Sequence, residues 1–165
     1  MERAAIEDTG GYLVIDCALF EPDIPQNAGA ILRLGACLGV PVHVIHPTGF
    51  AISDRNLRRA GLDYLSRAEL IQHDDWPSFE AWRRNAGRPL IALSTHGCVA
   101  LHDHAFRSDD ILLFGRESAG LPDAATDAAD AVLRIPIRPG NRSLNVAVAA
   151  AIAIAEALRQ TAQLP

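Results

Sequence analysis

The 165-residue sequence contains no lysine, and several motifs of common enzyme sites are missing as well. A GxxxxGK[S/T] loop needs a lysine for its phosphates, so a nucleoside triphosphatase of that class is excluded. No GxGxxG motif follows the first apolar segment, which leaves a dinucleotide-binding loop without support. GxSxG is missing too, so the sequence carries no nucleophile elbow of the α/β-hydrolase type.

Cysteine is scarce, and its three positions give no support for a metal site. Cys17, Cys37 and Cys98 form no CxxC pair and lie in apolar or strand-like contexts. We expect them to be reduced, buried, small apolar side chains rather than zinc ligands. Cys98 is followed by His102 and His104, but these residues lack the paired spacings of a closed zinc site, so we expect no metal.

No apolar run reaches the roughly 18 residues that span a membrane, and no signal-like segment precedes the first strand. We therefore expect a cytoplasmic protein with no membrane partner. By length the chain forms one domain over residues 13–165, after a flexible N-terminal extension at residues 1–12.

The net charge of −5 counts against a nucleic-acid partner, but all 15 basic residues are arginines, which suit phosphates and bases. Composition leaves the partner open.

Apolar strand-like segments alternate with helical patterns along the chain. We expect strands at 13–20, 42–46, 89–94, 111–114 and 131–136. We expect helices near 27–39, 54–62, 76–86 and 143–161, with a short extra turn near 122–128. Such alternation predicts an α/β fold, with a mostly parallel sheet and helices on both of its faces.

Capping residues mark the ends of two helices. We expect Asn27 as the N-cap of the first helix, Gly39 as its end, and Ser143 as the N-cap of the last helix. The last helix is apolar on nearly every side, and a helix that is apolar all round must be covered all round. Two explanations stay open, namely burial against a second subunit and a central position within the monomer.

Two strands each run into a loop of glycine, proline and polar residues, ILLFGRESAGLP and RIPIRPGNRSLN. Loops at the carboxyl ends of buried strands hold ligands in open α/β proteins. In the first loop, Gly115 exposes backbone groups and Glu117 can accept hydrogen bonds from an amine or a hydroxyl. In the second, Ser143 and Asn145 reach a helix start, where backbone N–H groups are unpaired. The two loops predict a ligand site.

Arginines in two helical segments are further candidates. Arg33 lies within the apolar run AILRLGAC, six residues after Asn27, so the two side chains do not share one helix face. They converge only if Asn27 lies in the loop before the helix. Arg58 and Arg59, in LRRAGLDY, fit a solvated helix face as well as a basic patch.

Taken together, the motifs NxGxxxR, LRRAGLDY, FGxExxGLP and IPxxPxxRSLN, followed by an alanine-rich helix, resemble one family. Over about residues 13–161 the chain resembles the SPOUT-class RNA 2′-O-ribose methyltransferases. Among these it is most similar to the small bacterial group that modifies cytidine or uridine 34 of tRNA. The resemblance implies a SPOUT fold with a C-terminal deep trefoil knot, which no sequence pattern predicts. It also implies a homodimer and S-adenosyl-L-methionine as the cofactor, held in the knot loops.

The resemblance also assigns the site residues. The implied cofactor-binding residues are Leu93, Gly115, Ile135, Ile137 and Ser143, and the implied catalytic residues are Arg33, Glu117, Ser143 and Asn145. The implied RNA-binding residues are Asn27, Arg58, Arg59, Arg138 and Arg142. Arg33 is expected to reach the site across the dimer. Because a guanidinium keeps its proton far above neutral pH, we expect this residue to orient ribose or phosphate and to stabilise negative charge.

The implied reaction is methylation of the ribose 2′-hydroxyl of the wobble nucleotide in the anticodon stem-loop of tRNA, with leucine tRNAs as expected substrates. The alternatives are the same chemistry at another tRNA or rRNA nucleotide, and a knotted RNA-binding dimer without catalysis. The chain departs from the common family pattern at three positions. Ala28 and Ala30 remove two polar side chains near the substrate. Arg116 replaces a frequent proline, which we expect to loosen the turn and to add positive charge.

Overall fold

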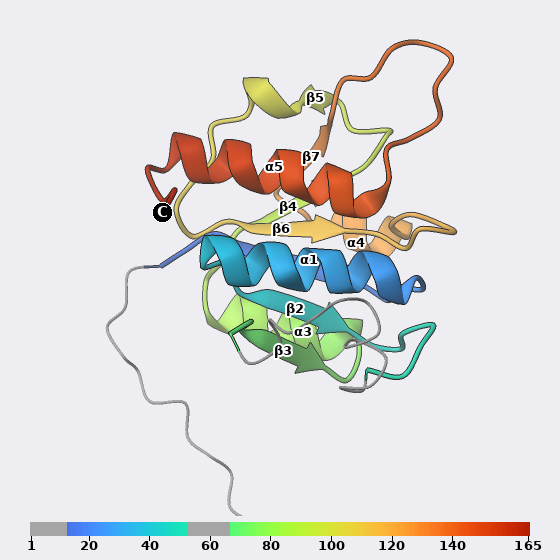
Figure 1. Ribbon diagram of the computed structural model, residues 1–165, viewed down its shortest axis with the longest axis vertical. Coiled ribbons are helices and arrows are strands. Elements are labelled where there is room, and N and C mark those ends of the chain that lie inside the picture. Colours follow the sequence, from blue (N-terminus) through green and yellow to red (C-terminus); the bar gives the residue numbers. More distant parts are fainter. Residues whose placement is uncertain (1–12, 53–66) are drawn as a thin grey trace, which may run out of the picture.

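The computed structural model describes residues 13–52 and 67–165, which form a seven-stranded sheet with helices on both faces (Figure 1). The expected extension at 1–12, the expected helix near 54–62 and the two arginines Arg58 and Arg59 lie outside the described residues. The strand order is β3-β2-β1-β6-β4-β7-β5, and each neighbouring pair runs parallel. The predicted parallel α/β architecture is confirmed.

Five of the strands lie where the apolar segments predicted them. They are β1 (Asp16–Phe20), β2 (Val42–Ile45), β4 (Leu90–Leu93), β6 (Ile111–Phe114) and β7 (Ala131–Arg134). Sequence reasoning missed β3 (Leu70–His73) and β5 (Val99–Ala100), which form the two edges of the sheet. Both are short and partly exposed, so neither shows the continuous apolar run that marks a central parallel strand.

Among the described residues, two helices cover each face of the sheet. Helices α1 (Pro25–Leu38) and α5 (Val146–Gln160) lie on the face that Cys17 and Leu19 of β1 point to. Helices α3 (Trp76–Asn85) and α4 (Asp123–Asp127) lie on the other, with Ala18 and Phe20 (Figure 1). This alternation is the period of two expected of a strand buried on both sides. A 3-10 turn, η1 (Leu101–Asp103), follows β5. Within the described residues, no helix is long and apolar enough to cross a membrane.

The helix starts differ from the sequence prediction. Helix α1 begins at Pro25, with Ile24 at the N-cap position, so the prediction of Asn27 as N-cap is wrong. Proline is favoured in the first helical turn because its φ is already helical and its missing N–H would have no partner there. Gly39 ends the helix in a left-handed conformation, as predicted. Helix α5 is capped by Asn145 rather than by Ser143, because the Asn145 side chain accepts from two backbone N–H groups.

The prediction that all three cysteines are buried is wrong for two of them. Cys17 is fully buried in β1, whereas Cys37 and Cys98 are exposed. Burial, together with the neighbouring Asp16 carboxylate, raises the pKa of the Cys17 thiol well above its ordinary range. Cys37 is exposed because it lies on the outer side of α1, which the local apolar sequence does not reveal.

Beneath α3 the sheet buries a row of charged and polar groups. The Asp16 carboxylate accepts from Nη1 of Arg88 and lies 3.0 Å from Nε2 of His43. Nδ1 of His43 lies 2.9 Å from Nε2 of His73, and both rings pack against Trp82. Burial, with a smaller contribution from His43, lowers the pKa of His73 to about 4. His73 is therefore neutral in the folded protein near neutral pH.

We expect this arrangement to make folding acid-sensitive through His73. The pKa of His73 is about 4 in the folded protein against 6.5 for an ordinary histidine. Below pH 6.5 the unfolded chain therefore binds a proton at this residue that the folded chain does not bind. The His73 contribution to the free energy of unfolding should fall by about 2 kcal/mol between about pH 7.5 and about pH 5. Urea unfolding at several pH values measures it. His73→Gln should flatten this dependence and exposed His102→Gln should not; equal slopes for all three proteins would contradict the prediction.

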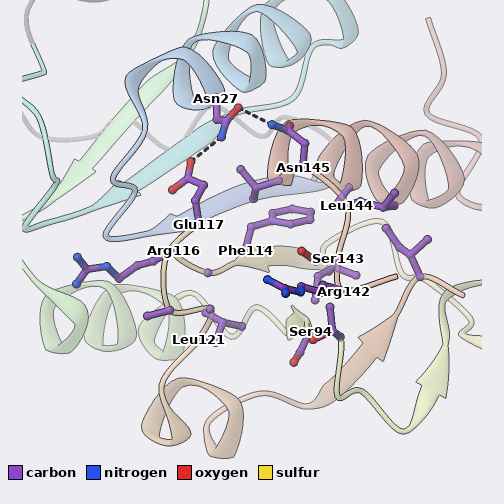
Figure 2. A pocket seen from close by; sticks show the side chains of 18 of the residues that line it. Asn27, Ser94, Phe114, Arg116, Glu117, Leu121, Arg142, Ser143, Leu144 and Asn145 are labelled. Carbon is purple, nitrogen blue, oxygen red and sulfur yellow. Dashed lines mark hydrogen bonds between the residues drawn. The ribbon is translucent and has the colours of Figure 1, made fainter. Parts of the chain in front are cut away.

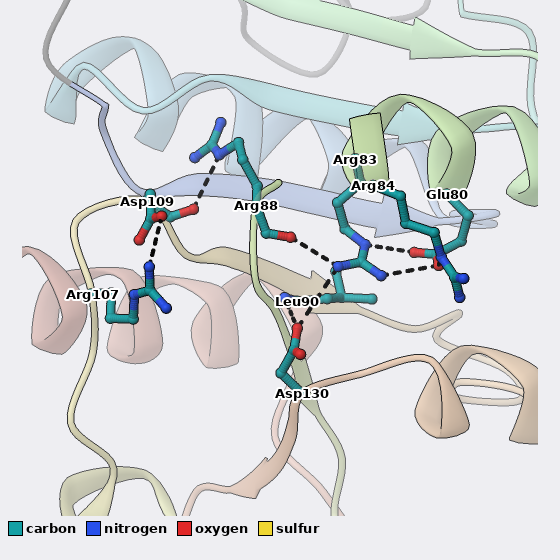
Figure 3. A network of polar contacts seen from close by, with 8 residues as sticks. All are labelled: Glu80, Arg83, Arg84, Arg88, Leu90, Arg107, Asp109 and Asp130. Carbon is teal, nitrogen blue, oxygen red and sulfur yellow. Dashed lines mark hydrogen bonds and ion pairs between the residues drawn. The ribbon is translucent and has the colours of Figure 1, made fainter. Parts of the chain in front are cut away.

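A second buried cluster joins α3 to the sheet (Figure 3). Nε and Nη2 of Arg83 donate to the two carboxylate oxygens of Glu80, at 2.6 and 3.0 Å. Nη1 of Arg83 donates to the backbone carbonyl of Arg88 at 2.8 Å and lies 3.7 Å from the Asp130 carboxylate. That carboxylate also accepts from the N–H of Leu90. One guanidinium therefore connects α3, the start of β4 and the segment before β7.

Arg83 and Arg84 offer a matched test of buried and exposed ion pairs, because both donate to Glu80. Arg83→Ala should lower the free energy of unfolding by about 2 kcal/mol, since it leaves buried acceptors without a donor. Arg84 is 70% exposed, and Arg84→Ala should cost less than about 1 kcal/mol. Urea denaturation of the two variants decides the matter. Equal losses would show that burial does not govern this cluster.

Candidate active site

A cavity of about 570 Å³ opens at the carboxyl ends of three neighbouring strands, β4, β6 and β7 (Figure 2). The start of α5 and the start of α1 complete its walls. In an open parallel sheet this edge is the usual place for a ligand, because the loops there can differ without disturbing the strands. The two loops that the sequence singled out both contribute to it.

One part of the cavity is apolar and closely shaped around a glycine. Leu93, Phe114, Ile135 and Ile137 supply apolar side chains to the lining. At Gly115 the chain passes so close to the backbone of Gly120 that an added Cβ would collide with it. Gly115 therefore serves a close backbone approach within the β6 loop, whereas the sequence suggested only that it exposes backbone groups.

The opposite part of the cavity is a row of hydrogen-bonded polar side chains (Figure 2). Nδ2 of Asn145 donates to Oδ1 of Asn27 at 2.9 Å, and Nδ2 of Asn27 donates to Oε1 of Glu117 at 3.1 Å. Oδ1 of Asn145 accepts from the N–H groups of Ala147 and Val148, which caps α5. The polar row joins the starts of α1 and α5 to the β6 loop.

The carboxyl group of Glu117 lies beside that of Asp23, and the two have opposite protonation tendencies. Burial raises the pKa of Glu117, and the neighbouring Asp23 raises it further. Hydrogen bonds with Glu117 and with the Ser118 hydroxyl lower the pKa of Asp23 to about 2. When one proton is shared by this pair, it resides on Glu117. Glu117 can therefore hold a proton at a higher pH than an ordinary glutamate.

Arg116 closes the β6 loop rather than loosening it, which corrects the sequence expectation. Its N–H donates to the carbonyl of Gly120 at 3.1 Å, and the N–H of Gly120 donates back at 2.8 Å. A proline at this position could make only the second bond. The side chain adds the expected positive charge, and Nη1 lies 3.2 Å from the Glu21 carboxylate.

The structure brings most of the predicted site residues together. The cavity lining includes Asn27, Leu93, Gly115, Glu117, Ile135, Ile137, Arg142, Ser143 and Asn145. Arg33 and Arg138 are not part of it. Arg33 is exposed on α1, six residues or about 9 Å along the helix axis from Asn27. Arg138 is exposed in the loop after β7. Arg58 and Arg59 lie outside the described residues.

Sequence reasoning missed several residues around the cavity. Ser94, Thr95 and His96 follow β4 and also line the cavity, as Ile24 does from the segment before α1. For Thr95 and His96 the signal was their place directly after the predicted strand at 89–94, since the carboxyl ends of parallel strands share one edge. Across the described ranges, no three His, Cys, Asp or Glu side chains are grouped to hold a metal ion.

Comparison with known proteins points to one family. The model of the SpoU rRNA Methylase family matches residues 15–155. A Beijerinckia indica protein named tRNA (cytidine(34)-2'-O)-methyltransferase is 55% identical over 147 residues, which are 89% of this chain and 92% of that protein. An Ancylobacter novellus protein of the same name is 50% identical over 149 residues, 90% of this chain and 94% of that protein.

Solved structures agree with the sequence relatives. A structure described as "Structural insights into the 2-OH methylation of C/U34 on tRNA" has a TM-score of 0.85 and 42% identity, and covers 91% of this chain and 97% of its own. The SpoU methyltransferase AviRb from Streptomyces viridochromogenes, in complex with the cofactor AdoMet, has a TM-score of 0.79 and 27% identity, and covers 91% of this chain and 58% of its own. The family model, the sequence relatives and the fold agree, and the chain belongs to the SpoU rRNA methylase family.

Proposed function

We propose that this protein methylates the ribose 2′-hydroxyl of nucleotide 34, a cytidine or uridine, in tRNA, using S-adenosyl-L-methionine. The observation that carries the proposal is the cavity itself, where an apolar part that includes Gly115 faces the polar row of Asn27, Glu117 and Asn145. The names of the relatives at 50–55% identity support the same nucleotide.

The residues present fit the cofactor. A cavity of about 570 Å³ is in the range that holds molecules of this size. Gly115 contributes to the lining without a side chain, and Leu93, Ile135 and Ile137 offer apolar surface beside it. Ser143 adds a hydroxyl. Bound there, S-adenosyl-L-methionine would supply an electrophilic methyl group.

The chain's polar side chains would then hold the substrate. Asn27, Glu117 and Asn145 would bind and orient the ribose, because their mutual hydrogen bonds restrict their positions. Arg33 would orient the ribose or a phosphate and stabilise the negative charge that develops as the hydroxyl loses its proton. Since Arg33 does not line the cavity of its own chain, we propose that it acts at the site of a second copy.

The outer face of α5 supports a homodimer. Ala150, Ala153 and Ile154 are completely buried against the sheet, so the described part of the chain covers one side of this helix. On the other side Val148 is 49% exposed and Ile152 is 40% exposed. Isolated exposed apolar residues are common, but here they repeat along one helix face, which favours the second subunit over burial within the monomer.

The knot, the domain bounds and the RNA contacts are inferred from membership of the family. We propose that segment 135–145 and α5 form the trefoil knot, within a single domain over 13–165 that follows the extension at 1–12. Arg138 and Arg142 are exposed in the same segment and would contact the anticodon stem-loop, together with Arg58 and Arg59. Leucine tRNAs are the proposed substrates, and the cytoplasm the proposed location.

Methyl transfer to unmodified tRNA tests the proposal. The protein is incubated with labelled S-adenosyl-L-methionine and unmodified tRNA, and the methylated nucleotide is mapped. We expect 2′-O-methylation confined to position 34 and strongest on leucine tRNAs. Methylation at another tRNA or rRNA nucleotide would reassign the substrate. Cofactor binding without methylation of any RNA would favour a non-catalytic RNA-binding dimer.

A further inference from the structure

We infer that Asp23 is a positioning residue for methyl transfer, which holds Glu117 in the polar row of the cavity. Asp23 lies in the short segment between β1 and α1 and is not part of the cavity lining. The inference rests on the proposed function, since it concerns how the same site is held. Its basis is a set of hydrogen bonds between segments 94 residues apart in the sequence.

Asp23 and Glu117 bind each other reciprocally. The N–H of Asp23 donates to Oε2 of Glu117 at 3.1 Å, and the N–H of Glu117 donates to Oδ1 of Asp23 at 3.1 Å. The Ser118 hydroxyl donates to the other oxygen of the Asp23 carboxylate. Asp23 therefore positions both the backbone and the side chain of Glu117, and the Ser118 hydroxyl orients the Asp23 carboxylate in turn.

Glu117 passes this placement on to the rest of the polar row. Its second oxygen, Oε1, accepts from Asn27, whose own carbonyl oxygen accepts from Asn145. A rotation of the Glu117 side chain would break its bond to Asp23 or its bond to Asn27. As long as Asp23 holds Glu117, the amide of Asn27 is also restricted to one orientation.

The segment that carries Asp23 is itself firmly seated. The N–H of Gly49, in the loop after β2, donates to the carbonyl of Pro22 at 2.9 Å. A Cβ added at Gly49 would approach Cα of Asp23 to 2.8 Å, so the two backbones are in close contact. Pro25 then starts α1 directly. Asp23 can hold Glu117 in place because its own segment is fixed by the contact with Gly49 and by the start of α1.

The negative charge on the Asp23 carboxylate is balanced by the neighbouring Arg116 guanidinium. Hydrogen bonding keeps the pKa of Asp23 at about 2, so its carboxylate is ionised at neutral pH. Nε of Arg116 lies 3.8 Å from that carboxylate, and Arg116 also pairs with Glu21. The ion pair offsets the repulsion that two neighbouring carboxyl groups would otherwise exert.

Steady-state methylation kinetics with variants at Asp23 test the inference. Asp23→Ala removes the acceptor for the Glu117 N–H, and we expect kcat to fall about tenfold or more, because small displacements of orienting groups are costly. Dissociation constants for S-adenosyl-L-methionine and KM for tRNA should change less than about threefold, since the apolar part of the cavity and the phosphate contacts are untouched. Asp127→Ala, at the exposed end of α4, is the matched control and should match the wild type.

Two further variants separate positioning from a general effect on folding. Asp23→Asn keeps an oxygen for the Glu117 N–H, while the Ser118 hydroxyl can reverse and accept from its amide, so kcat should return to within about threefold of the wild type. In a Glu117→Ala background, Asp23→Ala should lower kcat by less than about twofold, because the Glu117 side chain that Asp23 positions is gone. If Asp23→Ala does not fold, Asp23→Ser, whose shorter side chain misses the Glu117 N–H, replaces it under the same criteria.

Three results would overturn the inference. They are unchanged kcat in Asp23→Ala, an Asp23→Asn variant as impaired as Asp23→Ala, and a full Asp23→Ala effect in the Glu117→Ala background. A wild-type protein that methylates no tRNA would instead overturn the proposed function, so the two failures are distinguishable.

Discussion

Replacement of Arg33 by alanine is expected to lower kcat for tRNA methylation by about 100-fold or more, with S-adenosyl-L-methionine binding unchanged. In the proposed role of Arg33, the loss would follow from removing a positive charge beside the oxygen on which negative charge develops. Binding should persist because Arg33 lies on the exposed side of α1 and does not line the cavity of its own chain. Initial rates with unmodified tRNA and calorimetric titration with the cofactor measure the two quantities.

The control for Arg33→Ala is Arg107→Ala, which removes an exposed arginine outside the cavity lining and should leave kcat near the wild-type value. Methylation by Arg33→Ala at the wild-type rate would remove Arg33 from the proposed site. A parallel loss of cofactor binding would indicate instead that Arg33 supports the fold of the cavity.

Mixed dimers test whether Arg33 acts in the second subunit. Arg33→Ala chains keep their own cofactor cavity, and Gly115→Val chains keep their own Arg33. If the site is shared across two copies, each mixed dimer has one complete site, and co-refolding the two inactive variants should restore about a quarter of the wild-type activity. No recovery from verified mixed dimers would show that Arg33 acts within its own chain.

The second large effect is expected at Gly115, where Gly115→Ala should weaken cofactor binding by about 100-fold or more. The added Cβ collides with the backbone of Gly120 and Leu121, so no side-chain rotation can make room for it. The Arg116–Gly120 hydrogen bonds would have to break, and the β6 loop would change shape. Calorimetric titration measures the affinity, and methylation should fall with it.

Gly87→Ala is the matched control for the Gly115 prediction. Gly87 has a φ of +65°, and a Cβ there meets nothing within 4 Å. The substitution should cost about 1 kcal/mol of stability through its left-handed backbone, without affecting cofactor binding. Cofactor binding by Gly115→Ala as tight as that of the wild type would falsify the assignment of this cavity to the cofactor.

Periodicity predicted the central elements because their environment is uniform along each segment. β1 and β6 are buried on both faces; β6 is a continuous apolar run, and in β1 only Asp16, at its start, is polar. The edge strands β3 and β5 were missed since partial exposure gives them no such pattern. The N-cap assignment of Asn27 failed for a different reason: asparagine suits a cap, but this side chain bonds to Glu117 and Asn145 instead.

The candidate site was only partly accessible to sequence reasoning. Gly115, Glu117 and Ser143 were identified because they follow strands or precede a helix, and these positions are local features. Asp23 was not identified, since nothing near it in the sequence indicates a hydrogen bond to Glu117. The exposure of Cys37 likewise depends on which side of α1 faces the sheet.

By itself, then, the sequence determined the α/β class, the parallel sheet and the loops that form the cavity, because strand and helix periods, turns and strand ends are encoded locally. The tertiary structure decided which polar groups meet. The order β1-β6-β4-β7 places the end of β6 beside the end of β1, so Glu117 reaches Asp23 and Asn27. It also decided that one side of α5 is buried while Val148 and Ile152 remain exposed. Such contacts join residues about a hundred positions apart, and only the packing of the whole sheet selects them.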